Sequence, residues 1–435
     1  MIRSLLALLA ALALPTTAAA QLTPQEQAMT AAVDSGRADA LALLSRMVNE
    51  NSGTMNHDGV RKVGAMVAKE FEALGFDTEW VEAPGTNRAG HLVARHVGDG
   101  TGKRMLLIGH VDTVFEPDSP FQSYVQEGDY ARGPGVGDNK GGVVVMLSAL
   151  RAMKRAGTLD AADIVAVITG DEEDTGEPLA IAREALIAAA EQSDVALDYE
   201  GLVRLDGRDM GSIARRSFGS YTIRVTAEAA HSSGVFSDAV GYGAIYEIAR
   251  IVDDFRETLR YGEERLTYNI GLIAGGEEVA IDDDLIRTTA RGKTNIVAPQ
   301  AILRGEMRAM TREQIARTQD AMRAIVANNL PGTTATIEFD EYYPPMPPTE
   351  GNAALLDALN AVNRDMGLPE MEALDPSRRG AADISYVAHL LDGINGLGPV
   401  VYGSHSDTER VDIPSIALQA KRAAILMSRL AQTPR

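Results

Sequence analysis

The chain has 435 residues, of which 45% are hydrophobic and 23% are charged. A single hydrophobic core stops growing near roughly 250–300 residues, so this length favours two domains or one domain with a large insertion. The composition is that of an ordinary globular protein and excludes collagen, coiled-coil and disordered classes. The net charge of −20 argues against partners such as nucleic acid or anionic lipid. The sequence contains no cysteine, which excludes disulfides, thiol nucleophiles and Cys-ligated metals.

The first 20 residues are typical of a secretory signal peptide. Arg3 supplies the positive charge, Ser4–Leu14 is an apolar run of 11 residues, and Ala18–Ala20 gives small residues before Gln21. The run is shorter than the about 20 residues that a membrane-spanning helix needs. A buried N-terminal helix is the alternative. We expect cleavage near Ala20, export to the periplasm or secretion, and no membrane insertion of the mature chain.

From residue 23 to about residue 212 the sequence alternates helical and strand patterns. The expected helices are 23–47, 57–75, 141–157 and 175–190, and the expected strands are 78–81, 91–96, 105–111, 164–169 and 195–199. Ile164–Thr169 is a continuous apolar run, as in strands that are buried on both faces. The alternation predicts an α/β sheet with helices on both faces.

A different pattern begins near residue 212. Strands are expected over 220–226, 268–274, 301–310 and 333–339, and helices over 239–260 and 312–329. The resulting order β-α-β-β-α-β is typical of a small two-layer α+β domain with a four-stranded sheet. Helix and strand alternate again after the proline-rich Tyr343–Pro348. We therefore expect an α/β domain formed by residues 21–212 and 341–435, interrupted by an inserted domain over residues 213–340.

His110 and Asp112 stand at the end of a predicted buried strand. Alternate residues of a strand point to the same side, so the two side chains should emerge together. The carboxyl ends of strands are where open α/β sheets place their sites. A carboxylate beside a histidine is also the usual partner of a metal-ligating imidazole. A purely structural role for the pair is the alternative at this point.

Asp138 lies in a glycine-rich stretch with five glycines between residues 133 and 142. Glycines allow unusual backbone angles and close approach of ligands. One alternative is an aspartate that caps the following helix. Another is a phosphate-binding loop, but the sequence lacks the motif GxxxxGK[ST], and the negative net charge of the chain argues against phosphate binding.

Three further groups of polar residues follow predicted strands or lie near the C-terminus. Asp171-Glu172-Glu173 comes directly after the apolar strand, where neighbouring carboxylates are costly unless a cation or protons neutralise them. Asp198-Tyr199-Glu200 ends the next strand, and His405 lies in GSHSDTE. Each group alone is compatible with a solvated surface. Together with His110 and Asp138 they supply the nitrogen and oxygen ligands of a two-metal hydrolytic site.

The order of the motifs GHVDTV, GDNKGG, GDEE, DYE, AHSSG and SHSD resembles the co-catalytic di-zinc metallopeptidases. This family includes glutamate carboxypeptidase, succinyl-diaminopimelate desuccinylase, acetylornithine deacetylase, aminoacylase and peptidase T. The resemblance covers essentially the whole mature chain, and exported glutamate carboxypeptidase-like members look closest. It implies an α/β, phosphorylase/hydrolase-like di-zinc catalytic domain with a mixed sheet. An α+β ferredoxin-like lid, which also forms a homodimer, would interrupt that domain.

The resemblance implies two Zn²⁺ ions per chain, for which Co²⁺ or Mn²⁺ can substitute. The implied metal ligands are His110, Asp138, Glu173, Glu200 and His405. Asp138 would bridge both ions, His110 and Glu200 would complete one, and Glu173 and His405 the other. Asp198 competes with Glu200 for its role, and we prefer Glu200 because the family's carboxylate closes this motif. The family also implies a cis peptide bond between Asp138 and Asn139.

The same resemblance assigns catalytic and substrate-binding residues. Asp112 would orient His110, and Glu172 would be the general base that takes a proton from the attacking water and passes it to the leaving amine. His231, in AHSSG, would reach from the lid into the partner's site and stabilise the oxyanion. The implied substrate-binding residues are Asn295, Arg308 and Gly380.

The chain departs from the family pattern at two places. Residues 379–383 read Arg-Gly-Ala-Ala-Asp where the family usually shows Gly-Gly-Thr/Ser-Asp-Ala, so substrate contact by Gly380 is in question. Glutamate-selective members would offer basic residues to the substrate side chain. The stretch that returns from the inserted domain, residues 339–343, is instead acidic and aromatic.

These observations lead to one main functional hypothesis and several alternatives. We expect a zinc-dependent metallohydrolase of carboxypeptidase type, acting on a small peptide or N-acyl amino acid. It would cleave the amide bond between an acyl or aminoacyl group and a C-terminal amino acid, with glutamate as one candidate. An N-acyl-amino-acid deacylase or a dipeptidase on the same scaffold is the nearest alternative. A non-catalytic periplasmic binding protein is more remote, because binding alone needs no base such as Glu172, and a metal-storage or structural role is remoter still.

Overall fold

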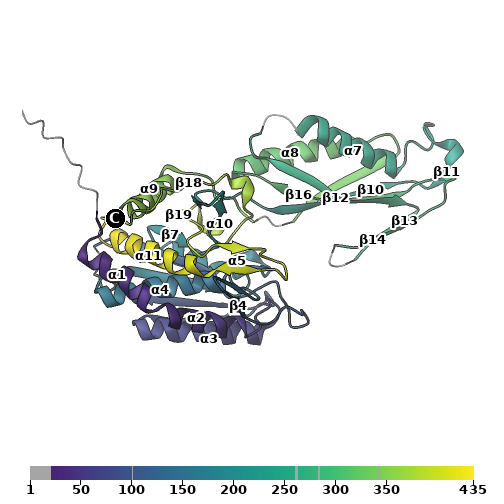
Figure 1. The fold of residues 1–435 in the computed structure, drawn as a ribbon. Helices are drawn as coiled ribbons and strands as arrows, with labels where there is room; N and C mark the ends of the chain where they lie inside the picture. The colour runs from purple at the N-terminus through teal and green to yellow at the C-terminus, as the bar shows by residue number, and fades with distance from the viewer. Residues whose placement is uncertain (1–20, 100, 260–262, 283–284, 341–342) are drawn as a thin grey trace, which may run out of the picture.

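The structure is a computed structural model that describes residues 21–435 except 100, 260–262, 283–284 and 341–342. The predicted signal peptide lies outside the described residues. Figure 1 shows two domains, one built on a six-stranded sheet and the other, projecting to one side, on a four-stranded sheet.

The six-stranded sheet has the strand order β1-β2-β6-β3-β7-β19. Its strands are β1 (Asp77–Val81), β2 (His91–His96), β3 (Arg104–His110), β6 (Asp163–Thr169), β7 (Val195–Asp198) and β19 (Asp392–Ile394). Strands β6, β3, β7 and β19 run parallel, whereas β1 and β2 pair antiparallel with their neighbours. The mixed sheet expected from the sequence is therefore confirmed.

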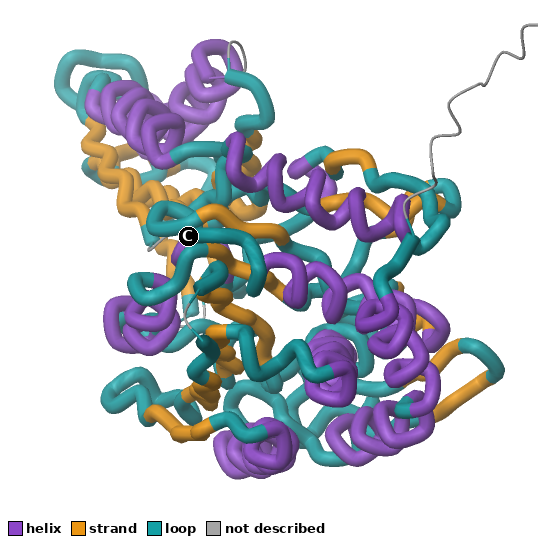
Figure 2. The backbone as a smooth tube through the Cα atoms, turned by 90° about the vertical axis from the view of Figure 1, so that its left-hand side faces the viewer, coloured by secondary structure: helices purple, strands orange, loops and turns teal. Residues whose placement is uncertain are grey.

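Helices cover both faces of this sheet, as Figures 1 and 2 show. Along β3, Met105 and Leu107 point into a larger core, and Leu106 and Ile108 point into a smaller one on the other face. The larger core includes α1 (Pro24–Ser35), α2 (Arg37–Val48), α3 (His57–Leu74), α4 (Lys140–Ala156), α9 (Glu350–Asp365) and α11 (Ile413–Leu430). The smaller core includes α5 (Leu179–Ala182), α6 (Glu184–Ala190) and α10 (Ile384–Val387).

Local signals explain where these helices begin and end. Thr23 and Glu26 form a reciprocal capping box at the start of α1. Gly75 and Gly157 end α3 and α4 with φ angles of 96° and 71°, which glycine adopts without strain. Each cap satisfies backbone groups that the helix itself leaves unpaired.

Three expected helices differ from the observed ones. The helix expected over 23–47 is two helices that meet at Gly36, where propensity is poor. The helix expected over 175–190 is the short pair α5 and α6, which begins only after Pro178. The helix expected from 239 begins at Ala244, because Gly241 and Gly243 have positive φ angles that a right-handed helix does not contain.

The second domain has an antiparallel sheet of order β12-β16-β10-β17. Its elements are β10 (Gly219–Ala227), α7 (Ala244–Leu259), β12 (Thr267–Gly276), β16 (Gln300–Arg308), α8 (Arg312–Ala327) and β17 (Thr333–Phe339). Both helices contribute to its core, in which Ile223 and Phe255 are fully buried. This is the expected ferredoxin-like arrangement. The pairs β11 (Ala230–His231) with β15 (Ile296–Val297) and β13 (Glu278–Ile281) with β14 (Thr288–Arg291) were not predicted.

Short elements complete the described chain. They are β4 (Val125–Glu127), β5 (Tyr130–Arg132), β8 (Arg204–Leu205), β9 (Arg208–Gly211), β18 (Glu372–Ala373), β20 (Val401–Tyr402), β21 (Arg410–Asp412) and the 3₁₀ turns η1 (Ser232–Gly234) and η2 (Pro376–Arg378).

The two crossings between the domains pair with each other. Arg215 and Met346 form one antiparallel bridge, and Phe218 and Tyr343 form another. The boundaries expected from the sequence, after residues 212 and 340, lie beside this paired junction. The junction brings Tyr343 next to the acidic residues described below.

Candidate active site and metal centre

The ends of three parallel strands gather the candidate residues. Strand β3 ends at His110, β6 is followed by Asp171-Glu172-Glu173, and β7 by Tyr199-Glu200. Since β3, β6 and β7 run parallel and side by side, their carboxyl ends meet at one edge of the sheet. Asp138 precedes α4, and His405 lies in the loop between β20 and β21.

His110, Asp138 and Glu200 form a first group of potential metal ligands. Nε2 of His110 lies 3.3 Å from Oδ1 of Asp138 and 3.3 Å from Oε1 of Glu200. The imidazole is 1% exposed. One neutral nitrogen ligand and two carboxylates around a common point suit a divalent cation of the zinc type.

Asp138, Glu173 and His405 form a second group. Nε2 of His405 lies 3.0 Å from Oε2 of Glu173 and 3.4 Å from Oδ2 of Asp138. Asp138 thus turns one oxygen to each histidine. A carboxylate shared in this way is what a pair of neighbouring cations requires, so the residues fit two ions. The peptide bond between Asp138 and Asn139 is cis, as expected.

Asp112 connects the first group to the loop that carries Glu172 and Glu173. Its Oδ1 lies 3.3 Å from Nδ1 of His110, the nitrogen that faces away from Asp138. The same carboxylate accepts the backbone N–H groups of Glu172 at 3.1 Å and Glu173 at 3.0 Å, and the hydroxyl of Thr54 at 2.7 Å. Asp112 is therefore placed to fix the orientation of the imidazole and of the loop together.

Glu172 approaches the first group without belonging to either set of ligands. Its Oε2 lies 4.0 Å from Nε2 of His110, and its Oε1 lies 3.4 Å from the hydroxyl of Tyr343. Burial, followed by the charges of nearby carboxylates, raises the pKa of Glu172 well above its ordinary value. A carboxylate that readily takes up a proton beside a metal centre is suited to general-base catalysis.

The geometry distinguishes Glu200 from its competitor Asp198. Oδ2 of Asp198 accepts a hydrogen bond of 2.6 Å from Asn395, so this carboxylate is already occupied. Burial, with the charge of Glu200, raises the pKa of Asp198 to about 7. Glu200 is the one that faces His110.

Glu409 is a buried residue of the site that the sequence analysis missed. Its carboxylate accepts the backbone N–H groups of Gly135 at 3.3 Å, Gly137 at 3.0 Å and Asp138 at 3.2 Å. It lies four residues after His405, so one loop provides a ligand of the second group and holds the segment that carries Asp138. The acidic residue so soon after a candidate ligand was the only signal in the sequence.

Two arginines beside Glu200 were also missed. Nη2 of Arg215 lies 3.7 Å and Nη2 of Arg379 lies 3.4 Å from Oε2 of Glu200. Burial, together with the neighbouring Arg215, lowers the pKa of Arg379 to about 10, so it stays charged at neutral pH. The unusual Arg-Gly-Ala-Ala-Asp stretch was the available signal for Arg379.

The candidate residues of the second domain lie in two different places. His231 and Asn295 are neighbours, since the N–H of Ser232 donates to the backbone oxygen of Asn295 at 2.9 Å. They lie by β11 at the far tip of the domain, away from the acidic residues of the same chain (Figure 1). Arg308 ends β16 near the junction, where its guanidinium pairs with Glu306 at 3.1 Å. Within one chain the structure therefore does not bring His231 and Asn295 to the site.

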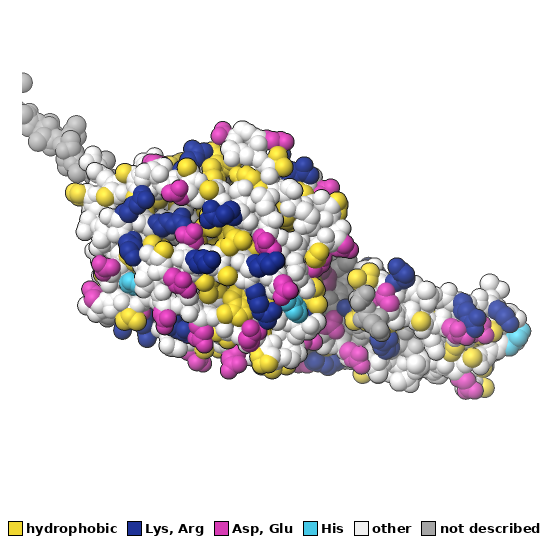
Figure 3. Space-filling view, turned by 90° about the horizontal axis from the view of Figure 1, so that it is seen from below, with side chains coloured by type: hydrophobic (Ala, Val, Ile, Leu, Met, Phe, Trp, Pro, Cys, Tyr) yellow, Lys and Arg dark blue, Asp and Glu magenta, His cyan; other side chains and the backbone are white. Residues whose placement is uncertain are grey.

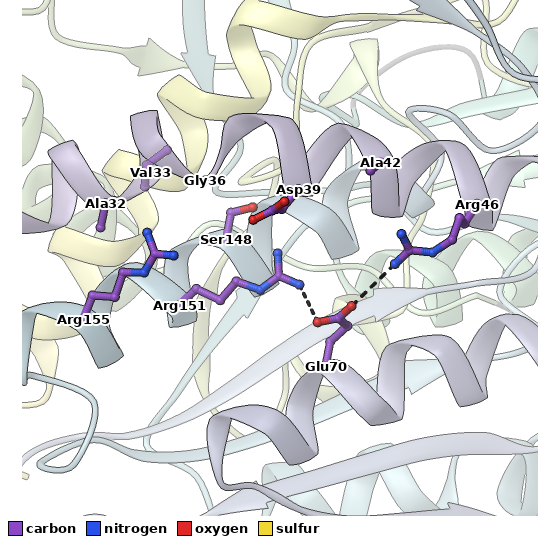
Figure 4. Close-up of a pocket in the computed structure, with 10 residues that line it drawn as sticks. All are labelled: Ala32, Val33, Gly36, Asp39, Ala42, Arg46, Glu70, Ser148, Arg151 and Arg155. Atoms are coloured by element: carbon purple, nitrogen blue, oxygen red, sulfur yellow. Dashed lines mark hydrogen bonds and ion pairs between the residues drawn. The ribbon is translucent and has the colours of Figure 1, made fainter.

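A separate groove lies among α1, α2, α3 and α4. Figure 3 shows the molecule from below, where Lys and Arg side chains are interspersed with Asp and Glu. In the groove Arg151 donates to Glu70 at 2.5 Å, and Arg46 lies 3.7 Å from the same carboxylate (Figure 4). None of the candidate ligands lines it. Two of its arginines, Arg46 and Arg151, share the carboxylate of Glu70.

Comparison with known proteins identifies the family. The pattern of peptidase family M20/M25/M40 matches residues 106–429. The chain belongs to this family. This M20-family protein is therefore a hydrolase of a metal-dependent peptidase family, and its histidine–carboxylate groups are the candidate metal-binding residues.

Individual relatives agree with this assignment. The M20 protein is 26% identical over 399 residues to carboxypeptidase G2 of Pseudomonas sp. (strain RS-16). The aligned region covers 88% of this chain and 87% of the relative. A crystal structure of a tripeptidase from Staphylococcus aureus superposes with a TM-score of 0.68 at 20% identity, over 91% of this chain and 99% of that chain. An M20 family metallo-carboxypeptidase from Sulfolobus solfataricus superposes with a TM-score of 0.64 at 14% identity, over 90% and 99%.

The described part of the M20 protein contains no helix that is long and apolar enough to cross a membrane.

Proposed function

We propose that this M20 hydrolase is a di-zinc carboxypeptidase-type enzyme that releases a C-terminal amino acid from an acyl or aminoacyl group. The observation that carries the proposal is the sharing of Asp138 between two histidine–carboxylate groups, with Glu172 beside them. The 26% identity to carboxypeptidase G2 over most of both chains supports the carboxypeptidase type.

Zinc is the proposed metal because the ligands are imidazole nitrogens and carboxylate oxygens without sulfur. Co²⁺ and Mn²⁺ accept similar ligands and are expected to substitute. When bound, the two ions polarise the scissile carbonyl and lower the pKa of the attacking water.

The residues of the chain perform the remaining steps. Glu172 takes the proton of the attacking water and delivers it to the amine that leaves, so its carboxylate is regenerated in each cycle. Asp112 keeps His110 oriented and holds the backbone of Glu172 in place. The hydroxyl of Tyr343 lies within hydrogen-bond distance of both the base, at 3.4 Å, and Asp383, at 3.2 Å.

A second copy of the chain is proposed to supply His231 and Asn295. These residues lie at the tip of the second domain, out of reach of their own site (Figure 1). An apolar patch formed by Phe236, Ile245, Tyr246 and Ile273 is exposed on this domain, next to β12, which is an edge strand of the sheet in the described part of the chain. Apolar surface beside an open sheet edge is what a homodimer contact would cover.

The test of the function is product analysis with a matched pair of variants. Residues 21–435, loaded with zinc, are incubated with N-acyl amino acids, folyl-glutamate-type amides and dipeptides, and free amino acids are measured by mass spectrometry. Glu172→Gln should bind zinc normally and lose turnover. The control Asp174→Asn changes an exposed residue of the same loop and should leave turnover intact. Turnover retained by Glu172→Gln would refute the role of the base.

The same panel separates the carboxypeptidase from its alternatives. An N-acyl-amino-acid deacylase would accept only the simple acyl compounds, and a dipeptidase only unprotected dipeptides. Absence of release from every compound, with two zinc ions bound per chain, would favour the binding-protein hypothesis.

The signal-like sequence of residues 1–20 supports export to the periplasm or secretion. Cell fractionation with N-terminal sequencing tests this proposal. A mature chain that begins near Gln21 outside the cytoplasm is expected, and an intact N-terminus in the cytoplasm would refute it.

A further inference from the structure

Arg379 adds a second guanidinium to the corner of the site where Arg215 faces Glu200. Glu200 already faces Arg215, which is 2% exposed and anchored by a hydrogen bond of 2.6 Å to the backbone oxygen of Ala381. Arg379 adds another guanidinium, with Nη2 at 3.4 Å from the same carboxylate oxygen. Two guanidinium groups that face the same carboxylate oxygen repel each other, so an additional anion beside Arg379 would be favoured.

The guanidinium of Arg379 has spare hydrogen-bonding capacity. It carries five N–H donors. Among the described residues, its contact with Glu200 is the only side-chain hydrogen bond or ion pair that it makes. Glu200 also accepts from Asn139 at 3.1 Å and faces His110, and it would share its charge with a bound cation. The donors of Arg379 are therefore left for a ligand.

The side chain of Arg379 is partly accessible to solvent, with an exposed fraction of 15%. The next residue, Gly380, is exposed, and a Cβ atom built on it would meet no atom within 4 Å. Arg379 thus contacts Glu200 with one end of its guanidinium while part of its side chain remains open to solvent. A structural arginine such as Arg215 is instead enclosed on all sides.

We propose that Arg379 is a specificity-determining residue that binds a carboxylate of the substrate close to the scissile amide. The proposal rests on the proposed function, because it assigns the substrate class of that same site. A guanidinium binds a carboxylate through two parallel hydrogen bonds, which fixes orientation as well as charge. The carboxylate is either the free C-terminal group or an acidic side chain of the released amino acid, and the experiment distinguishes the two.

The experiment compares three substrates that differ by one charge. They are N-acetylglutamate, N-acetylglutamine and the α-amide of N-acetylglutamate. Arg379→Met should lower kcat/KM roughly 10- to 100-fold, mainly through KM, for substrates that carry the recognised carboxylate, because a hydrogen bond to a charged group is worth that much. It should change kcat/KM less than about 3-fold for the substrate that lacks this carboxylate. Arg379→Lys should retain part of the activity, since lysine keeps the positive charge but cannot form the two parallel hydrogen bonds of a guanidinium.

The matched control is Arg378→Met, which removes the neighbouring, exposed arginine and should leave all three values unchanged. Zinc content and zinc affinity are measured for each variant. An equal loss with all three substrates, or a loss of zinc from Arg379→Met, would overturn the proposal and leave Arg379 as a positioning residue for Glu200.

A binding measurement separates this proposal from the proposed function. The zinc-loaded proteins are titrated calorimetrically with the same three compounds. If the wild type binds them without hydrolysis, the proposed function fails. The inference on Arg379 then stands if Arg379→Met selectively weakens binding of the carboxylate ligand, and fails if wild type and variant bind all three compounds equally.

Discussion

Arg183 is expected to be one of the residues on which the stability of the catalytic domain depends most. It is 1% exposed and lies 2.6 Å from Oδ1 of Asp171 and 3.0 Å from Oδ1 of Asp383, which are buried as well. It also donates to the hydroxyl of Thr175 at 3.0 Å and lies over the ring of Tyr386, 5.0 Å from its centre. Replacing Arg183 by Met would leave two buried carboxylates without their cation.

The size of the effect follows from this geometry. Removing one partner of a buried ion pair costs about 3–5 kcal/mol, because the remaining charge stays buried without compensation. Because Arg183→Met leaves two such carboxylates uncompensated, we expect the free energy of unfolding to fall by an amount at the upper end of this range, about 5 kcal/mol. Burial already raises the pKa of Asp171 despite the nearby arginine. Part of the cost will therefore appear as proton uptake by the carboxylates.

Urea unfolding at neutral pH, followed by circular dichroism, measures the effect. Asp171→Asn in the Arg183→Met background should recover about 1–3 kcal/mol, because it removes one of the two uncompensated charges. The control Arg364→Met breaks an exposed ion pair with Glu370 and should cost less than about 1 kcal/mol. A cost for Arg183→Met as small as that of the control, or no recovery in the double variant, would refute the reasoning.

Three further predictions concern pH, metal and assembly. Hydrogen bonds from Arg104 hold the pKa of Asp194 below its ordinary value of 3.8. The ionised Asp194 therefore stabilises the folded protein fully above pH 3.8, and this stabilisation is lost as the pH falls through the lowered pKa. Asp194→Asn should thus cost about 1–3 kcal/mol in urea unfolding at pH 7 and clearly less at pH 3; equal costs would contradict the linkage. Chelation of metal should lower Tm and abolish turnover, with zinc restoring both, because a ligand at about 100 times its Kd stabilises by about 2.7 kcal/mol per site. An unchanged Tm would show that the histidine–carboxylate groups hold no ion. Phe236→Asp should convert the proposed homodimer to a monomer in analytical ultracentrifugation, whereas Ile286→Asp, another exposed apolar position, should not.

Much of the fold could be predicted from the order of sequence patterns. The alternation around residues 105–111 and 164–169 predicted β3 and β6 because their side chains are apolar on both faces, as strands between two helical layers must be. The inserted domain was recognisable because its strands alternate with a period of two and its helices do not. Helix ends were less predictable, since Gly36 and Pro178 break segments whose hydrophobic periodicity continues across them.

Some residues of the catalytic domain could likewise be predicted from the sequence, and others could not. The motifs placed His110, Asp138, Glu173 and Glu200 at strand and helix ends, and parallel strands necessarily bring such ends together. By contrast, Arg183 falls in a segment that the sequence predicts as an ordinary helix, where an arginine is usually solvated.

The sequence by itself therefore determined the fold class, the family and the set of candidate ligands, because these depend on local periodicity and on the order of motifs along the chain. Only the tertiary structure decided that Glu409 holds the loop of Asp138, that Arg379 lies beside Glu200, and that His231 is out of reach of its own site. These facts depend on which residues distant in the sequence are buried against one another. Burial of a charged group changes its hydration and its partners, and no local pattern records it.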